Sequence, residues 1–305
     1  MLEAQVASQP GALLNPLDGA TYFEIDSSHV GDRFAVSVSV PVAYHTSTDP
    51  LPVMYVTDGN VAGPMSGGLA FSMFLREAIT QCRPYIQVNI GYTPEGLAQM
   101  VTSRNRDLVP PGEPIAPSMY PYMREHLGID EGLMPEAAMD LFFGSYADGH
   151  GDKLLTFIEH ELHPVIEKQF RVDSTDIAFH GYSFGGLLAL YALASGSQFF
   201  TRLGAGSPAV MVDDSVVFGL YESLAAAPNP ARDVHLHLTI NVHEMEGPVQ
   251  AYRKLAIGAL RFLDLVKEKP IPGLTITSEM VPGQDHEAGL IDAYRSFVRH
   301  AYRLS

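Results

Sequence analysis

The chain has 305 residues, with 35 acidic and 19 basic side chains and a formal net charge of −16 at pH 7. This excess of carboxylates argues against nucleic acid or an anionic membrane as a partner, because both require a concentrated positive surface. A single cysteine, Cys82, excludes an internal disulfide and a Cys-x-x-Cys metal or redox pair. A composition that is 46% hydrophobic and 18% charged predicts a globular protein with a sizeable core.

The N-terminal segment has no basic region followed by an apolar run, so we expect no signal peptide. No run of apolar residues is long enough to predict a membrane-spanning helix. We therefore expect a cytoplasmic protein that forms one domain over residues 1–305.

The first elements predict a mostly parallel sheet with helices on both faces. Residues 1–30 are turn-rich, and residues 33–42 alternate apolar and polar side chains as a half-buried antiparallel strand does. A short apolar run, residues 51–56, predicts a buried strand that ends in Asp58-Gly59-Asn60. A helix over 69–82 and a strand over 85–90 follow, and strand, helix and strand at this spacing are typical of a parallel crossover.

Residues 93–151 differ from the rest because they are rich in proline, glycine and methionine. A stretch of this composition inside a compact domain predicts a lid or substrate-binding insertion. Regular patterns then return as a helix over 152–169 with a kink at Pro164. Further helices and strands are expected to alternate over residues 187–194, 234–240, 248–266, 274–280 and 288–304.

The segment that carries chemistry is Gly181-x-Ser183-x-Gly185, which follows an apolar strand and opens a helical pattern. A serine on so sharp a turn needs small neighbours, and the turn exposes its hydroxyl at the helix N-terminus. Backbone N–H groups there can stabilise an oxyanion, and Phe184 supplies one of them. The pattern therefore predicts Ser183 as a nucleophile.

A serine nucleophile needs a base, and His286 is the best placed of the twelve histidines, in a loop between a predicted strand and the last helix. Either Glu244 or Glu246, just past the strand at 234–240, could orient this imidazole, and the residues leave the choice open. A metal-dependent hydrolase built on His235, His237 and His243 is the alternative chemistry. No matching carboxylate and third ligand accompany the His-x-His pair, so we expect no metal and no other cofactor.

Several segments together resemble the esterase branch of the α/β-hydrolases, which includes trilactone-siderophore esterases, feruloyl esterases, S-formylglutathione hydrolase and the mycolyltransferases. The likeness covers about residues 50–302 and rests on VMYVTDGN, RNRDLVP, the helix ending at 169, GYSFGGL, GSPA, VHEMEG and PGQDHEAG. Two positions depart from the family pattern, because Tyr182 stands where a histidine is usual and His243 where a glycine is usual.

The resemblance implies an α/β-hydrolase fold with Ser183 as nucleophile, His286 as base and Glu246 as the acid. It also implies that the loop at Asp58 supplies the second oxyanion donor, from the N–H of Gly59 or Asn60.

The expected activity is that of a serine hydrolase that cleaves a carboxylic ester or lactone through an acyl-enzyme. RNRDLVP favours a siderophore or other secondary metabolite as the small-molecule substrate, with Arg104, Arg106 and Tyr182 at the binding pocket. A structural salt bridge is an equally good interpretation of both arginines. The alternatives are a thioesterase similar to S-formylglutathione hydrolase and a non-catalytic binding protein of the same fold.

Overall fold

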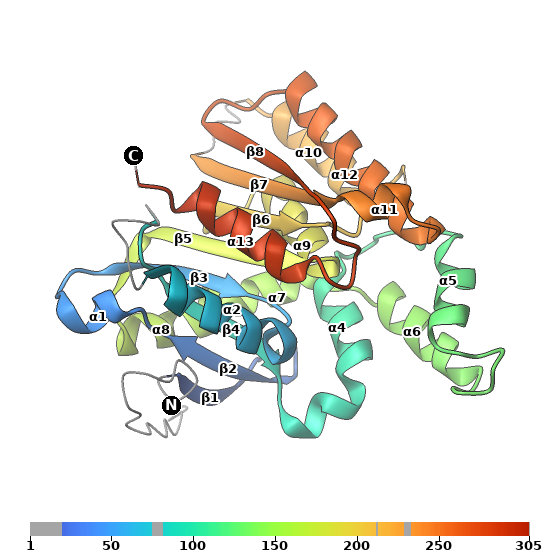
Figure 1. The fold of residues 1–305 in the computed structure, drawn as a ribbon, viewed down its shortest axis with the longest axis horizontal. Helices are drawn as coiled ribbons and strands as arrows, with labels where there is room; N and C mark the ends of the chain where they lie inside the picture. The colour runs from blue at the N-terminus through green and yellow to red at the C-terminus, as the bar shows by residue number, and fades with distance from the viewer. Residues whose placement is uncertain (1–19, 75–81, 212, 229–232, 305) are drawn as a thin grey trace.

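A twisted sheet runs through the centre of the computed structural model, which describes residues 20–74, 82–211, 213–228 and 233–304 (Figure 1). Within those residues the sheet has eight strands. In their order across the sheet they are β1 (Thr21–Asp26), β2 (Arg33–Ser39), β4 (Ile86–Tyr92), β3 (Leu51–Val56), β5 (Val172–Tyr182), β6 (Arg202–Gly206), β7 (Val234–Asn241) and β8 (Leu274–Val281). Strand β2 is antiparallel to both of its neighbours, and the pairs from β4 to β8 are parallel.

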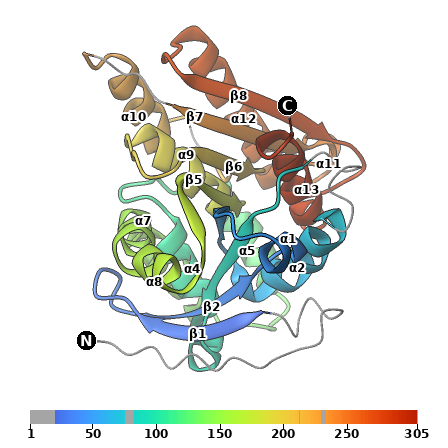
Figure 2. The same cartoon turned by 90° about the vertical axis from the view of Figure 1, so that its left-hand side faces the viewer.

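Helices cover both faces of this sheet (Figure 2). One face carries α1 (Val42–Thr46), α2 (Gly59–Phe74) and α13 (Leu290–Ala301). The other carries α7 (Gly151–Phe157), α8 (His163–Gln169), α9 (Phe184–Ala194), α10 (Val216–Ala225) and α12 (Gln250–Glu268). The predicted α/β class, with a mostly parallel sheet between two helical layers, is confirmed.

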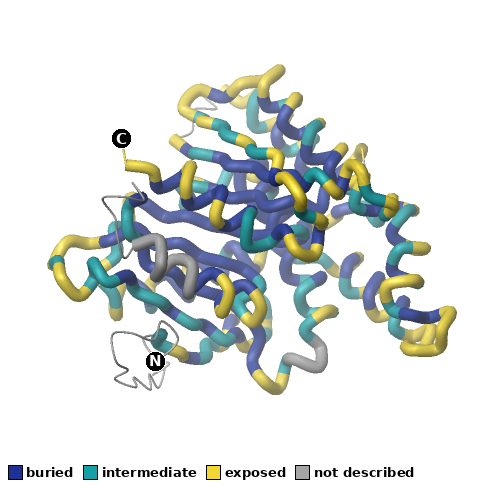
Figure 3. The backbone as a smooth tube through the Cα atoms, viewed as in Figure 1, coloured by how far each residue is buried: buried dark blue, intermediate teal, exposed yellow. Residues whose placement is uncertain are grey.

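The buried core is divided by the sheet, because successive side chains of a strand point to opposite faces. Along β3, Val53 and Tyr55 belong to the larger hydrophobic cluster, whereas Met54 and Val56 belong to the cluster under α13. All six residues of β3 are buried. Figure 3 shows the same pattern for the central strands, with exposed residues concentrated at the periphery. A continuous apolar run was therefore the correct signal for a strand covered on both faces.

Three details differ from the sequence-based expectations. Strand β1 lies in the segment expected to be only turn-rich, and it pairs with β2 at the edge of the sheet. The helix expected over 69–82 already begins at Gly59, and residues 75–81 lie outside the described part of the chain. The kink expected at Pro164 takes the form of a π-helical turn, η2 (Ile158–Leu162), between α7 and α8. A proline has no N–H to donate and its ring crowds the preceding turn, which accounts for the wider turn there.

The insertion at 93–151 is helical, and its helices are short because prolines separate them. It contains η1 (Pro94–Gln99), α4 (Met100–Leu108), α5 (Met119–His126) and α6 (Ala137–Ala147). Figure 1 shows α4, α5 and α6 beyond the ends at which β3 and β5 terminate. That edge of a parallel sheet is where α/β proteins commonly bind ligands. In the residues that the structure describes, no helix is both long and apolar enough to cross a bilayer.

Candidate active site

Ser183 lies on a sharp turn between β5 and α9. Its φ of 58° is in the left-handed region, which a non-glycine residue adopts only where the surroundings hold it. The N–H of Ser183 donates to the carbonyl of Gly206 at 2.9 Å, and the N–H of Ala209 donates to the Ser183 carbonyl at 2.9 Å. These two hydrogen bonds fix the backbone of the turn against the end of β6.

The glycines around Ser183 are required by close packing. A Cβ atom at Gly181 would overlap the backbone of Gly185. A Cβ atom at Gly185 would lie 2.5 Å from Oγ1 of Thr57, and one at Gly186 would lie 2.6 Å from the Gly206 carbonyl oxygen. The Gly-x-Ser-x-Gly pattern thus has the steric cause that was inferred from the sequence.

His286 lies beside Ser183, in the loop between β8 and α13. Its Nε2 is 3.0 Å from Oγ of Ser183, and its Nδ1 is 2.7 Å from Oε1 of Glu244. An Nδ1–H that donates to this carboxylate leaves Nε2 free to accept the serine proton. The imidazole is 8% exposed, and the ring of Tyr252 stacks on it at a centroid distance of 4.5 Å. Packing and hydrogen bonding therefore fix both its position and its tautomer.

The expectation that Glu246 contacts His286 is wrong, because the carboxylate at His286 belongs to Glu244. Both residues lie on the short helix α11 (Val242–Glu246), where residues two apart point in nearly opposite directions. Glu244 forms a capping box with Asn241 at the end of β7, which turns its side chain back toward the sheet. Glu244 is 1% exposed, whereas Glu246 is exposed.

A network of buried polar groups holds Glu244 and His286 in place. The hydroxyl of Ser207 donates to the Glu244 carboxylate, and Nδ2 of Asn241 donates to Oε1 of Glu244 at 3.0 Å. The same Nδ2 lies 2.6 Å from the hydroxyl of Tyr182, which itself donates to the carbonyl of His286 at 2.6 Å. Tyr182 thus links the loop that carries His286 (residues 282–289, the histidine loop) to the end of β7.

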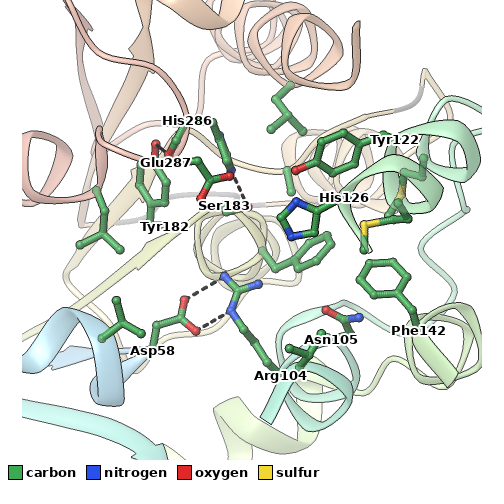
Figure 4. A pocket seen from close by; sticks show the side chains of 18 of the residues that line it. Asp58, Arg104, Asn105, Tyr122, His126, Phe142, Tyr182, Ser183, His286 and Glu287 are labelled. Atoms are coloured by element: carbon green, nitrogen blue, oxygen red, sulfur yellow. Dashed lines mark hydrogen bonds and ion pairs between the residues drawn. The ribbon is translucent and has the colours of Figure 1, made fainter. Parts of the chain in front are cut away.

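Ser183 and His286 open into a cavity of about 380 Å³. One wall comes from the ends of β3 and β5 and from α13, and the opposite wall comes from the insertion (Figure 4). The insertion contributes mostly apolar and aromatic side chains, namely Met100, Val101, Met119, Tyr122, Met123, Leu127 and Phe142. The residues expected to form a lid or substrate-binding segment therefore do line the cavity next to the serine.

Two segments present backbone N–H groups near Ser183. Phe184 is the first residue of α9, and Gly59 and Asn60 open α2, so these N–H groups have no carbonyl one turn earlier within their helices. Phe184 and Asn60 line the cavity, but Gly59 does not. Gly59 packs instead against β4, where a Cβ atom would lie 2.8 Å from the backbone of Ile90.

The two arginines of RNRDLVP have different environments. Arg104 lines the cavity and forms a bidentate ion pair with Asp58, with Nε–Oδ1 at 2.5 Å and Nη2–Oδ2 at 2.9 Å. Arg106 does not line the cavity, because it bonds to Asp32 at 2.6 Å and to the buried Asp107 at 2.8 Å. The expectation that Arg106 contacts the substrate is therefore wrong. Its role is the alternative considered above, a structural salt bridge.

The histidines proposed for a metal site do not converge. His235 and His237 on β7 share Oγ1 of Thr277, at 2.8 and 2.7 Å, whereas His243 is exposed on α11. His237, Glu279 and His300 do have ligand atoms within 4.8 Å of one another. The rings of His237 and His300 are nearly parallel, at 17° and 4.3 Å, so their in-plane lone pairs cannot meet at one ion. Both nitrogens of His237 also bond to hydroxyls, those of Thr277 and Ser296.

Sequence reasoning did not identify Asn241, Tyr252 or Glu287 at this site. One signal was available, since Asn241-x-x-Glu244 has the spacing of a capping box and would have favoured Glu244 over Glu246. Tyr252 and Glu287 had no such signal. They reach the site only because α12 and the histidine loop pack beside each other, which places the Tyr252 hydroxyl against the Glu287 carboxylate.

Comparisons with known proteins fit this geometry. A family model described as "Putative esterase" matches residues 145–240. A siderophore triacetylfusarinine C esterase of Aspergillus fumigatus is 28% identical over 200 residues, which cover 64% of this chain and 57% of that protein. Ferri-bacillibactin esterase BesA of Bacillus subtilis is 29% identical over 160 residues, which cover 52% and 48%. The chain thus spans about half the length of the curated relatives it matches.

A solved structure extends the likeness to nearly the whole chain. The BES protein from Bacillus cereus superposes with a TM-score of 0.71 over 97% of this chain and 98% of that chain, at 21% identity. At this identity the superposition shows that the two proteins share the fold.

Proposed function

We propose that this chain, which belongs to that esterase family, is a serine hydrolase that cleaves a carboxylic ester or lactone. The proposal rests on the chain of hydrogen bonds in which Ser183 Oγ lies 3.0 Å from Nε2 of His286 and Nδ1 of the same ring lies 2.7 Å from Glu244. A hydroxyl, an imidazole and a buried carboxylate in this order are the groups that acyl transfer requires.

The proposed reaction has two steps. Ser183 Oγ attacks the acyl carbon while Nε2 of His286 accepts its proton, and the imidazolium then protonates the departing alcohol oxygen. A water molecule, deprotonated by His286, next attacks the acyl-enzyme; the bond from the acyl carbon to Ser183 Oγ breaks, the imidazolium returns the proton to Oγ, and the acid is released. Glu244 accepts the Nδ1–H throughout and stabilises the positive charge on the ring. The N–H groups of Phe184 and Asn60 are the candidates to bind the oxyanion, since both residues lie in the first turn of a helix at the cavity.

The small-molecule substrate is proposed to be the ester or lactone of a siderophore or another secondary metabolite. The support is that both curated relatives are named as esterases of siderophores. The insertion supplies the cavity wall that faces Ser183, so residues 93–151 are proposed to select the acyl or alcohol group. Arg104 and Tyr182 are proposed to shape this pocket.

Substitution of the nucleophile tests the proposal. The wild-type protein is expected to hydrolyse p-nitrophenyl butyrate and to react with a fluorophosphonate at Ser183, and Ser183→Ala is expected to do neither. Ser197→Ala, outside the cavity, is the control. A panel of oxygen esters, thioesters and trilactones, with products identified by mass spectrometry, separates an esterase from a thioesterase. Absence of both turnover and labelling in the wild-type protein would instead favour a non-catalytic binding protein.

A further inference from the structure

The charged groups that line the cavity are few, and the carboxylates outnumber the guanidinium. Among the described lining residues, Arg104 is the single guanidinium or ammonium group, and it faces two carboxylates, those of Asp58 and Glu287. His126, a lining side chain from the insertion that can also carry a positive charge, is exposed and stacks on Tyr122. The cavity therefore has no surplus of positive charge with which to receive an anion.

The positive charge of Arg104 is already used within the protein. Both carboxylate oxygens of Asp58 accept hydrogen bonds from its guanidinium, in the fork geometry that matches arginine to a carboxylate (Figure 4). Burial acts to lower the pKa of Arg104, but the charge and hydrogen bonds of Asp58 outweigh it and raise the pKa above its ordinary value. A substrate anion would have to compete with Asp58 for this group.

The negative charge of Glu287 is also held at the cavity. The hydroxyl of Tyr252 donates to it, and the hydroxyls of Tyr122 and Tyr252 lie 2.7 Å apart. These contacts connect the insertion, α12 and the histidine loop. Because Glu287 directly follows His286, an anionic substrate group near the serine would meet a fixed carboxylate.

The remaining lining is mostly apolar and adaptable. Four methionines contribute, Met100, Met119, Met123 and Met211, together with leucines and the rings of Phe142 and Phe184. Methionine side chains are unbranched and polarisable, so they adapt to irregular apolar ligands. An ionic group in contact with such a surface would lose its hydration without gaining a partner.

We propose that the cavity accepts an uncharged, mainly apolar acyl or alcohol group and rejects a carboxylate or polyanionic one. This inference rests on the proposed esterase function and restricts its substrate. The net charge of −16 acts in the same direction at long range, but salt screens that contribution. The local contribution, from desolvation and from the partly buried carboxylate of Asp58, is screened much less by salt.

A matched substrate series tests the charge preference. We would compare p-nitrophenyl hexanoate with p-nitrophenyl monoadipate, which is ionised at about pH 7.5, and with its uncharged methyl ester. The kcat/KM of the two uncharged esters is expected to exceed that of the monoadipate at least about tenfold, because the anion is desolvated without a partner. The difference is expected to persist at about 0.5 M NaCl, where long-range repulsion is screened.

A variant pair shows whether the cavity itself sets the preference. Val101 lines the cavity and is 52% exposed, so a longer side chain is accommodated there. Val101→Lys is expected to raise the kcat/KM for monoadipate relative to hexanoate several-fold, and the uncharged Val101→Met is expected not to.

Equal turnover or preference for the monoadipate by the wild-type protein would overturn the inference while leaving the esterase function intact. So would an unchanged ratio in Val101→Lys. Failure of the proposed function itself looks different, since none of the esters would then be hydrolysed and Ser183 would not react with a fluorophosphonate.

Discussion

The carboxylate of Glu244 lies 2.7 Å from Nδ1 of His286, while Glu246, two residues later on the same short helix, is exposed. The capping box with Asn241 turns Glu244 toward the sheet, and Ser207 bonds to the same carboxylate. Glu244 therefore reaches the imidazole with its position fixed by backbone and side-chain donors from β7 and the turn after β6.

Because of this arrangement, substitutions of the two glutamates are expected to affect kcat very differently. Glu244→Gln is expected to lower kcat for p-nitrophenyl butyrate by roughly 10²- to 10⁴-fold, because the imidazolium loses its stabilising charge. Glu246→Gln is expected to leave kcat within about twofold. Steady-state kinetics of the two variants, measured in parallel, shows which glutamate supports His286. A large loss of kcat in Glu246→Gln alone would assign that role to Glu246 instead.

The hydroxyl of Tyr182 is expected to position the histidine loop. Tyr182→Phe removes the donor to the His286 carbonyl and takes one buried acceptor away from Nδ2 of Asn241. We expect a loss of about 1–3 kcal/mol in the free energy of unfolding and a lower kcat with little change in KM. Urea denaturation and kinetics provide the two measurements. Tyr120→Phe, at a 48% exposed position, is the control, and the prediction fails if the two variants behave alike.

Buried histidines are expected to make the protein sensitive to acid. Burial lowers the pKa of His180 to about 3, and burial with nearby positive groups lowers that of His237 to about 3. The unfolded chain then binds protons below pH 6.5 that the folded chain does not, so stability is complete above that pH and falls toward pH 3. The limiting slope is about 1.4 kcal/mol per pH unit for each histidine.

His180→Phe tests this slope cleanly, because neither ring nitrogen of His180 has a hydrogen-bond partner among the described residues. The variant is expected to lose less stability than the wild-type protein when the pH is lowered from about 7 to about 5. His243→Gln, at an exposed position, is expected to keep the wild-type slope. Urea denaturation at a series of pH values gives the slopes, and identical slopes for His180→Phe and the wild type would refute the prediction.

Glu113 is expected to make the protein less stable as the pH rises, the opposite of the effect of the buried histidines. Burial raises its pKa to about 7, although Ser215 and the N–H of Val216 donate to its carboxylate. The folded chain therefore holds a proton that the unfolded chain releases above pH 4.5, and this contribution to stability is lost as the pH rises through 7. Glu113→Gln, which keeps an acceptor for Ser215, is expected to be more stable than the wild type at about pH 8, by on the order of 1–3 kcal/mol.

At about pH 5 this advantage is expected to disappear, since the wild-type carboxyl is then protonated. Chemical denaturation of the variant at both pH values measures the effect. Glu125→Gln, at an exposed position, serves as the control. A Glu113→Gln protein that is less stable than the wild type at both pH values would contradict the assigned charge state.

Local features of the sequence determined the elements and the sharp turn at Ser183. Continuous apolar runs predicted buried strands such as β3, and glycines on both sides of Ser183 predicted a turn that only small neighbours permit. Such features depend on sterics and periodicity within a few residues, so they can be recognised without the rest of the chain. The edge strand β1 was missed because it has little apolar alternation of its own.

The tertiary structure decided which of several similar residues reach the site. Glu244 rather than Glu246, Asn60 rather than Gly59 and Arg104 rather than Arg106 line or support the cavity. Each pair is adjacent or nearly so in the sequence, and the difference lies in the direction of a helix or loop relative to the sheet. That direction is set by packing between segments far apart in the chain, which also brings Tyr252 onto His286 and Asp58 onto Arg104. The charge of −16 excluded classes of partner, but only the pairing of charges inside the cavity indicates what the cavity accepts.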